Sequence, residues 1–305
     1  MLKLFVSLLG AGFFLAACGD DLQREYYPDK KVKSEARYVN GVKQGPEKEF
    51  YESGALKAET GYEAGVRSGL SKTFFENGKI RSEVPYENDQ MEGTLVTYYE
   101  NGNIKSKTLY RKNVPADFPE TFDTDGAPAA SGSFKDSRDR LSYEWVRIQN
   151  QIWLAQNMNF APVKGSVCAQ CNVWGRLYNF ESAKIACPEY FRMPSEEDWN
   201  TLLKNTAPES GKNLKASFGW DPVFTANDYG NGTDAFGFAA RAGGGHFASA
   251  EVPVKSRKFE NAGRNAYFWV DDGRVLVLSH SKPEAEFRKF NPEHGASLRC
   301  VRTVN

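Results

Sequence analysis

The first half of the chain repeats one pattern of apolar, polar and glycine positions with a period of 24 residues. The tetrapeptide YESG at residues 51–54 returns as FENG at 75–78 and as YENG at 99–102. Aromatic residues precede each tetrapeptide and Leu or Ile follows it, whereas Lys and Glu fill the intervening positions. Ser-Gly or Asn-Gly between such runs is typical of a two-residue hairpin turn in which glycine supplies a positive φ. The pattern therefore predicts one β-hairpin per repeat.

Weaker copies extend the pattern in both directions, so that about five units occupy residues 26–134. A single hairpin cannot bury its apolar face, and neighbouring units must therefore stack. We predict an elongated β-hairpin array whose tyrosines form its stacked core rather than a platform for a ligand. Residues 18–25 are expected to be a tether before the array. Residues 123–136, rich in Gly, Ala, Pro and Ser at their centre, are expected to close the array and link it to the second half.

The repeat resembles the MORN-repeat variant of bacterial YwqK-like antitoxin proteins. It has that family's Tyr-x-x-x-Gly pattern, followed by a Gly-x-x-x-Gly element that occurs here as GVKQG at 41–45 and GVRSG at 65–69. The resemblance implies an interaction scaffold that carries no catalytic residues.

The composition changes from Tyr143 onward, and all six Trp residues lie in this second half. Residues 146–154 are expected to form a hairpin. Residues from about 175 to 187 lead into a short helix, and Ser195 with Asp198 gives the capping-box spacing that opens another. Short apolar runs follow among glycine-rich loops, and a final strand is expected over 297–304. Two early helices and several later strands indicate an α+β domain of about 170 residues over 136–305.

The decapeptide QIWLAQNMNF lies at 151–160 and is followed by GRLY at 175–178, RMPS at 192–195 and SLRCV at 297–301. These elements and their order closely resemble the Fibrobacter succinogenes major paralogous domain, in which the decapeptide looks like the QTWMAENLNY element. The resemblance implies a fold like that of C-type lectins and formylglycine-generating enzymes. The family has no established general activity, so the resemblance indicates fold more than function.

Residues 1–17 have the features of an export signal. Lys3 gives a short positive region, residues 4–17 carry no charge, and the segment is too short to span a bilayer as a mature helix. It ends in Leu-Ala-Ala-Cys, which resembles the bacterial lipobox and implies that Cys18 becomes the lipid-modified N-terminus. A plain secretory signal cut near Ala17 is the alternative. Gly19 rather than Asp follows the cysteine, which favours the outer membrane under the enterobacterial sorting rule.

Four further cysteines, an even number, indicate two disulfides in an exported protein, and three connectivities are possible. The lectin-like resemblance favours Cys187–Cys300, which leaves Cys168–Cys171 as a tight local loop. Redox chemistry or metal binding at Cys168 and Cys171 is the alternative. One CxxC without another pair or a nearby His offers too few ligands for a structural zinc site.

Motifs of hydrolases, zinc proteases and phosphate-binding loops are absent from the sequence. GGGH at 243–246 superficially resembles an oxyanion loop, but without a nucleophile elbow it is interpreted as a flexible loop. Glu196, Glu197 and Asp198 are expected in the first turn of a helix, where carboxylates favour the helix dipole.

Two weak binding hypotheses arise from the same half. An oxygen-rich segment containing Asp221, Asp228 and Asp234 could hold Ca²⁺, although its spacing does not match an EF-hand. Exposed Trp or Tyr residues among Asn, Asp and Arg would suit stacking on sugar rings, although most Trp residues are expected in the core.

The 305 residues carry 39 Lys and Arg against 39 Asp and Glu, and 40% are hydrophobic. The hydrophobic content supports folded cores, and the neutral balance makes nucleic acid a poor partner. We therefore expect a non-enzymatic, lipid-anchored protein of the cell envelope, without a required cofactor, that recognises a glycan, a cell-wall polymer or an envelope protein. The alternatives are an enzyme of the formylglycine-generating type, which would need a reactive cysteine pair near Cys300, and an antitoxin or immunity protein.

Overall fold

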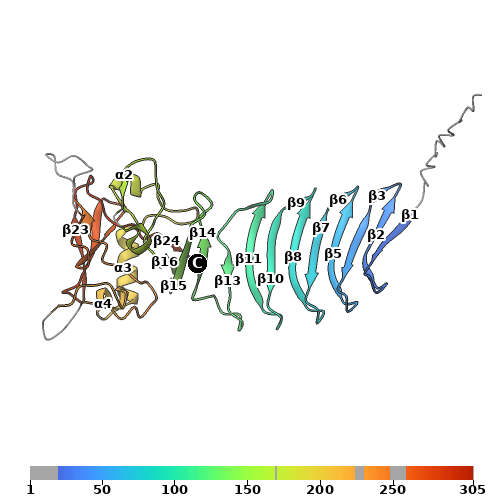
Figure 1. Ribbon diagram of the computed structural model, residues 1–305, viewed down its shortest axis with the longest axis horizontal. Coiled ribbons are helices and arrows are strands. Elements are labelled where there is room, and N and C mark those ends of the chain that lie inside the picture. The colour runs from blue at the N-terminus through green and yellow to red at the C-terminus, as the bar shows by residue number, and fades with distance from the viewer. Residues whose placement is uncertain (1–19, 169, 224–229, 248–258, 305) are drawn as a thin grey trace, which may run out of the picture. The chain divides into compact units, whose positions relative to one another are not determined.

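The computed structural model describes residues 20–168, 170–223, 230–247 and 259–304 (Figure 1). Strands dominate it, and the few helices among these residues are short. By their internal contacts the residues form two compact units, one ending at Pro128 and one beginning at Ala129. The expected signal peptide and Cys18 lie outside the described residues. No described helix has the length and apolar character needed to cross a bilayer.

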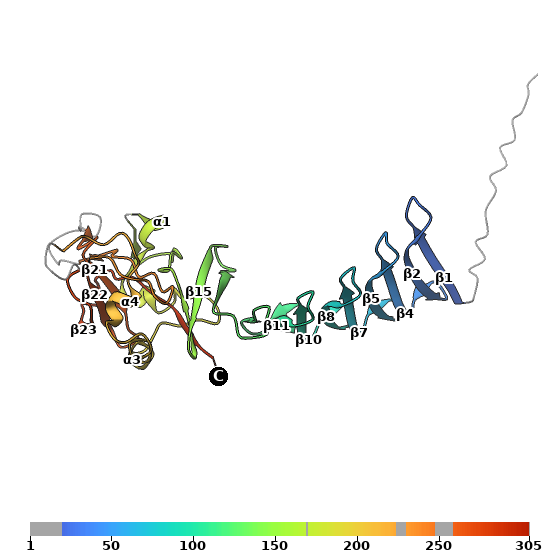
Figure 2. The same ribbon diagram turned by 90° about the horizontal axis from the view of Figure 1, so that it is seen from below.

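The first unit is one antiparallel sheet whose strands follow one another in chain order, as Figures 1 and 2 show. Its main path is β1-β2-β4-β5-β7-β8-β10-β11-β12, and the short strands β3, β6, β9 and β13 pair beside β2, β5, β8 and β11. The thirteen strands are β1 Asp20–Tyr26, β2 Val32–Val39, β3 Val42–Lys43, β4 Gly45–Phe50, β5 Leu56–Glu63, β6 Val66–Arg67, β7 Gly69–Phe74, β8 Ile80–Glu87, β9 Gln90–Met91, β10 Gly93–Tyr98, β11 Ile104–Arg111, β12 Val114–Pro115 and β13 Glu120–Thr121. Residues 20–25, assigned from sequence to a tether, lie in β1.

The predicted hairpins are present, but the turn at 51–55 is longer than two residues. The amide of Tyr51 donates to Ala55 O at 2.8 Å, and the amide of Gly54 donates to Tyr51 O at 2.8 Å. Three residues therefore lie between the hydrogen-bonded pair, and of these only Gly54 has a positive φ, of 91°. A two-residue type I′ turn needs a positive φ at both central positions, which Ser53 does not adopt.

The two-residue turns occur instead at the other end of each repeat. Residues 40–41, 64–65, 88–89 and 112–113 all have positive φ and connect directly paired strands. The second position is Gly41 or Gly65 in the first two repeats, and Asp89 or Asn113 in the next two. Asn and Asp tolerate the left-handed conformation better than most non-glycine residues, so the turn type persists without glycine.

Tyrosine hydroxyls tie successive repeats together. Tyr27, Tyr51 and Tyr99 each donate a hydrogen bond to the backbone carbonyl of the residue 23 positions later, over 2.7, 2.7 and 2.9 Å. In the remaining repeat the equivalent residue is Phe75, which has no hydroxyl group. These contacts give Tyr27, Tyr51 and Tyr99, which are half-buried, a structural role between repeats.

The two faces of the sheet differ in chemistry. On one face, cross-strand partners alternate in charge through one continuous row: Arg24, Glu35, Lys48, Glu59, Lys72, Glu83, Val96, Lys107 and Glu120. On the opposite face, the adjoining row consists largely of small residues: Glu25, Ser34, Glu49, Ala58, Thr73, Ser82, Thr97, Ser106 and Thr121. Consecutive side chains of a strand point to opposite faces, so the two rows lie back to back.

The second unit combines small sheets with short helices. Its largest sheet has the order β14-β15-β16-β24, so the last strand of the chain pairs with an early one. A three-stranded sheet has the order β21-β22-β23, and β17-β18 and β19-β20 form two-stranded ladders. The elements are β14 Ser131–Lys135, β15 Ser142–Ile148, β16 Gln151–Leu154, β17 Ser166–Val167, α1 Cys171–Trp174, β18 Leu177–Tyr178, α2 Phe180–Ala183, α3 Glu196–Asn205, α4 Ser210–Leu214, β19 Gly245–His246, β20 Phe259–Glu260, β21 Asn265–Trp269, β22 Arg274–Ser279, β23 Ala285–Lys289 and β24 Val301–Thr303.

Several expectations for this unit are confirmed and two are not. The hairpin of β15 and β16 is present, and α3 begins with the complete capping box of Ser195 and Asp198. Residues 243–246 are not a flexible loop, since they are buried and Gly245–His246 forms β19. The terminal strand is only Val301–Thr303, because residues 297–300 are held by single bridges and loop contacts instead.

Large aromatic side chains fill the core of the second unit. Trp153, Trp199, Phe238 and Phe268 are fully buried, and the Trp153 and Trp199 rings lie 4.6 Å apart. Trp145, Trp220 and Trp269 are also buried. The prediction that most Trp residues belong to the core is thus confirmed, and Trp174 is the exception.

Candidate functional site

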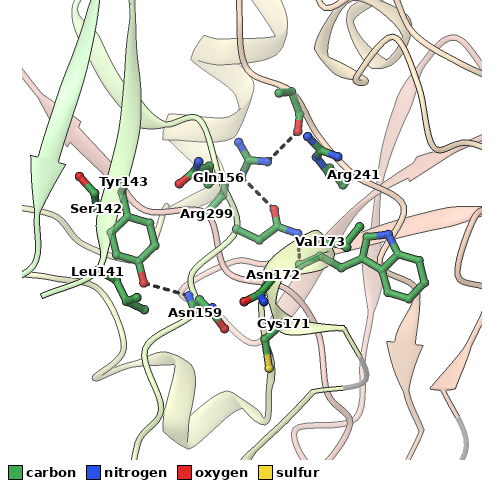
Figure 3. A pocket seen from close by; sticks show the side chains of 14 residues that line it. Leu141, Ser142, Tyr143, Gln156, Asn159, Cys171, Asn172, Val173, Arg241 and Arg299 are labelled. Atoms are coloured by element: carbon green, nitrogen blue, oxygen red, sulfur yellow. Dashed lines mark hydrogen bonds between the residues drawn. The ribbon is translucent and has the colours of Figure 1, made fainter. Parts of the chain in front are cut away.

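A cavity of about 340 Å³ opens in the second unit beside α1 (Figure 3). Its walls come from the start of β15, the loop after β16, α1 and loop segments near residues 240 and 299. The lining residues are Leu141, Ser142, Tyr143, Gln156, Asn157, Asn159, Cys171, Asn172, Val173, Trp174, Gly175, Ala239, Arg241 and Arg299.

Arg299 joins three of these segments at the base of the cavity. Its guanidinium donates to Asn157 Oδ1 at 3.0 Å, to Leu154 O at 3.0 Å, to Phe238 O at 2.5 Å and to Ala239 O at 3.1 Å. Four of its five N–H groups can thus be engaged, which fixes the loop after β16 against the segment at 238–239.

The charge of Arg299 is held without a salt bridge to any described residue. The side chain is fully buried, and its guanidinium lies 4.5 Å from the centre of the Phe238 ring. Burial lowers the pKa of Arg299 to about 9, although the negative charge of Asp234 acts in the opposite direction. The cavity floor therefore has a positive potential at neutral pH.

Asn157 connects this base to α1. Its side-chain amide donates to Trp174 O at 2.8 Å and to Ser297 Oγ at 3.2 Å, while its oxygen accepts from Arg299 Nε at 3.0 Å. The orientation of the amide is thereby defined, since each of its two ends has a partner of the required polarity.

Tyr143 and Asn159 form the opposite wall. The amide of Asn159 donates to Tyr143 Oη at 3.1 Å. Burial is the main cause that raises the pKa of Tyr143 to about 12, so its phenol is neutral at physiological pH. The side-chain oxygen of Asn159 is buried and has no hydrogen-bond partner among the described residues. It is an acceptor that the protein itself leaves unsatisfied, which is uncommon for a buried polar atom.

The single turn of α1 forms the rim. Cys171 is held by its disulfide to Cys168, and Asn172 and Val173 are exposed. Trp174 is half-buried. On the other side of the opening, the Arg241 guanidinium stacks on Phe218 at 4.4 Å from the ring centre.

The lining is suited to neutral or anionic polar ligands. Amide groups of Gln156, Asn159 and Asn172 offer donors and acceptors, and the Arg241 guanidinium offers paired donors. Among the described lining residues none carries a carboxylate or an imidazole. Such a site can bind a polyhydroxylated ligand, but its described groups contain no general base with a pKa near neutrality.

The predicted cysteine sites take part in two disulfides. Cys187–Cys300 joins residues 113 positions apart, and Cys168–Cys171 closes a loop of separation 3. Cys171 lines the cavity, so the second disulfide borders the site that the sequence did not identify.

The structure describes two of the three candidate calcium ligands, and each of these has a partner within the protein. The Asp221 carboxylate lies 3.5 Å from Arg264 Nε, and Asp234 Oδ1 accepts from the amide of Ala239 at 2.8 Å. Asp228 lies outside the described residues. No group of three or more His, Cys, Asp or Glu side chains within the described ranges is placed to hold a metal ion.

Sequence reasoning missed the cavity because its residues are scattered from Leu141 to Arg299. One local signal was present: the AQNMNF end of the family-like decapeptide supplies Gln156, Asn157 and Asn159. Nothing in the sequence indicated that Arg299 would be buried beside them.

Comparison with known families identifies both halves. The family model of the Fibrobacter succinogenes major domain matches residues 146–302, just over half of the chain, and the chain belongs to this family. The MORN repeat variant matches four times, at residues 22–40, 43–64, 67–88 and 91–112. No curated protein matches the chain.

Proposed function

We propose that this member of the Fibrobacter succinogenes major domain family is a non-enzymatic recognition protein of the cell envelope, anchored by lipid at Cys18 and directed to the outer membrane. In this proposal the C-terminal domain binds a glycan through the cavity beside α1. The repeat array is the scaffold that carries it.

The observation that carries the proposal is the chemistry of the cavity lining. Amide side chains, the Arg241 guanidinium and the half-buried Trp174 surround one opening. Sugars present hydroxyl groups at their edges and C–H faces on their rings, which such amides and such an indole can contact together.

A lectin-like fold for this domain is part of the proposal. It is supported by the pairing of β16 with β24, which brings the two ends of the domain together. It is also supported by the disulfide that links Cys187, after α2, to Cys300, before β24.

The proposal includes neither calcium nor thiol chemistry. Asp221 and Asp234 already have partners in Arg264 and the backbone of Ala239, which argues against their use as metal ligands. Cys300 is bonded to Cys187, whereas an enzyme of the formylglycine-generating type would need reactive thiols. These observations favour binding over the enzymatic alternative.

A glycan array probed with the full chain, with and without EDTA, tests the proposal. We expect binding to a limited set of glycans, undiminished by EDTA and weakened about tenfold by Gln156→Ala with Asn172→Ala, since each removes an exposed hydrogen-bonding group. Asn200→Ala, on the exposed face of α3 and outside the cavity, is the matched control and should bind normally.

Two outcomes would contradict the proposal. Absence of binding to any envelope or cell-wall glycan would exclude the glycan ligand. Loss of binding in EDTA would instead require a calcium site, with Asp221, Asp228 and Asp234 as its first candidates.

A further inference from the structure

A second concave surface lies on the repeat array, on the face that carries the small residues. It is a groove of about 960 Å³, which spans residues from Glu49 to Ser106 and six consecutive strands of the main path, from β4 to β11. It is separate from the cavity beside α1, since its lining belongs wholly to the first unit.

Paired hydroxyl groups form the floor of this groove. The side-chain oxygens of Thr60 and Ser71 lie 2.8 Å apart, those of Thr73 and Ser82 2.6 Å apart, and those of Thr97 and Ser106 2.6 Å apart. Each pair uses one hydroxyl hydrogen for its internal bond. The second hydroxyl hydrogen of each pair can therefore donate to a ligand, and lone pairs on the same oxygens can accept from it.

A basic residue lines the groove at the same position of three successive repeats. In every hairpin the strand register shifts by one residue at a β-bulge, as between Glu49 and Phe50 opposite Lys57. A bulge redirects a side chain that would otherwise alternate to the other face. The extra residues are Lys33, Lys57, Arg81 and Lys105, of which the last three line the groove and all four are exposed.

The first two of these cations are neutralised and the last two are not. Lys33 Nζ lies 3.6 Å from Glu25 Oε2, and Lys57 Nζ lies 3.5 Å from Glu49 Oε2. At the positions equivalent to these glutamates the third and fourth repeats have Thr73 and Thr97. Consistent with this exchange, neither Arg81 nor Lys105 forms an ion pair with any described residue.

The spacing of the two unpaired cations defines a repeat length for a ligand. Arg81 and Lys105 occupy β8 and β11, which are two strand intervals apart, or about 10 Å. A disaccharide unit of an extended β-linked polysaccharide covers a similar distance. Tyr51 and Phe75 lie along the same groove and offer ring faces for sugars.

From these observations we propose that the groove over the third and fourth repeats binds an acidic polysaccharide with one carboxylate in every disaccharide. Arg81 and Lys105 contact successive carboxylates, and the hydroxyl pairs contact the sugar hydroxyls between them. The recessed hydroxyl floor favours a sugar chain over a membrane surface, because lipid headgroups would meet the exposed cations without reaching the floor.

Hyaluronan oligosaccharides, which carry one carboxylate on every second sugar, provide the probe. Calorimetric titration of the full chain should detect an octasaccharide and a much weaker disaccharide, because only the longer chain reaches both cations. Arg81→Gln with Lys105→Gln should weaken octasaccharide binding about tenfold, since two exposed ion pairs are lost. Carboxyl-reduced hyaluronan should bind as weakly to the original chain as hyaluronan does to this variant.

Two further variants test whether binding depends on the groove itself, and not on the net charge of the array or on a loss of fold. Thr73→Glu with Thr97→Glu restores the acidic partners of the first two repeats and should weaken binding similarly. Lys72→Gln with Lys107→Gln removes the same charge from the opposite face and should leave binding unchanged. Thermal unfolding of each variant identifies any loss of fold.

The proposal would be overturned if Lys72→Gln with Lys107→Gln weakened hyaluronan binding as much as Arg81→Gln with Lys105→Gln does. So would binding to anionic phospholipid vesicles without binding to hyaluronan. Because Gln156 and Asn172 lie in the other unit, their substitution should leave hyaluronan binding intact, so this proposal and that of the C-terminal cavity can fail separately.

Discussion

At the scale of single residues, Arg299 is the buried charge on which the C-terminal cavity depends. Replacement by Met would keep much of the side-chain volume but leave the carbonyls of Leu154, Phe238 and Ala239 without their donor. We expect the domain to lose about 3–5 kcal/mol of unfolding free energy, since each unsatisfied buried acceptor costs about 1–3 kcal/mol and the costs do not simply add.

Chemical denaturation of the full chain, followed by tryptophan fluorescence, measures this loss because all six Trp residues lie in the second half. Arg264→Met is the control, since that side chain is 65% exposed and its contact with Asp221 is long. A loss of unfolding free energy equal to that of the control would mean that the hydrogen bonds from Arg299 to these carbonyls do not stabilise the domain.

Asp198 gives a prediction of pH dependence. Burial alone would raise the pKa of this carboxyl, but hydrogen bonds from Arg192 and from the Ser195 amide and hydroxyl outweigh it, so the pKa lies below 3.8. The ionised carboxylate therefore stabilises the domain above about pH 4, and this contribution is lost as the pH falls through the folded-state pKa.

Asp198→Asn should lower the unfolding free energy at pH 7 by about 1–3 kcal/mol, since it weakens hydrogen bonds to a charged group. It should also flatten the decrease in stability on acidification below pH 4. Unfolding curves between pH 2.5 and 7 test both effects, with the exposed Glu197→Gln as the control. An unchanged acid slope would exclude Asp198 as the titrating group.

At the scale of elements, the missing hydroxyl of Phe75 interrupts the series of tyrosine contacts between repeats. Tyr51 donates to Phe74 O and Tyr99 donates to Phe122 O, so a tyrosine at 75 would be placed to donate to Tyr98 O. Phe75→Tyr should stabilise the array by about 0.5–1.5 kcal/mol, the net value of one hydrogen bond, and Tyr51→Phe should destabilise it similarly.

Circular dichroism of the full chain, recorded during thermal unfolding, can follow the strand signal for both variants. Tyr38→Phe serves as the control, since no hydrogen bond of its hydroxyl is among the described contacts. Destabilisation by Phe75→Tyr would mean that the third repeat differs in geometry from its neighbours.

The turns show what the sequence could predict for these elements. The 24-residue period located the hairpins correctly because it reflects the apolar positions of every strand. It misassigned the turns, because Ser53 and Gly54 look like a two-residue turn although only Gly54 adopts a positive φ. The true two-residue turns include Asp89 and Asn113, whose φ values depend on the surrounding ladder and not on glycine.

The C-terminal site was less accessible to sequence reasoning for a physical reason. Its parts come from residues as far apart as Tyr143 and Arg299, which tertiary contacts such as the pairing of β16 with β24 and the hydrogen bonds of Arg299 bring together. An arginine before a terminal strand is more often solvated than buried, so its role followed from tertiary structure alone. The groove of the array was hidden similarly, since the bulge that directs Lys57 to its face has no sequence signature of its own.

At the scale of the whole molecule, the two units should respond differently to reduction. The four cysteines of the disulfides lie in the second unit, and residues 20–128 contain none. Opening Cys187–Cys300 frees a loop with a sequence separation of 113, which is worth roughly 4–5 kcal/mol in the chain-entropy account, whereas Cys168–Cys171 closes a very short loop.

A calorimetric scan in reductant should therefore lower the unfolding temperature of the second unit and leave that of the array unchanged. Cys187→Ser with Cys300→Ser should reproduce that shift, and Cys168→Ser with Cys171→Ser should produce a much smaller one. A shift of both transitions would show that the units unfold together, because only thermodynamic coupling could transmit the loss to a unit without cysteines.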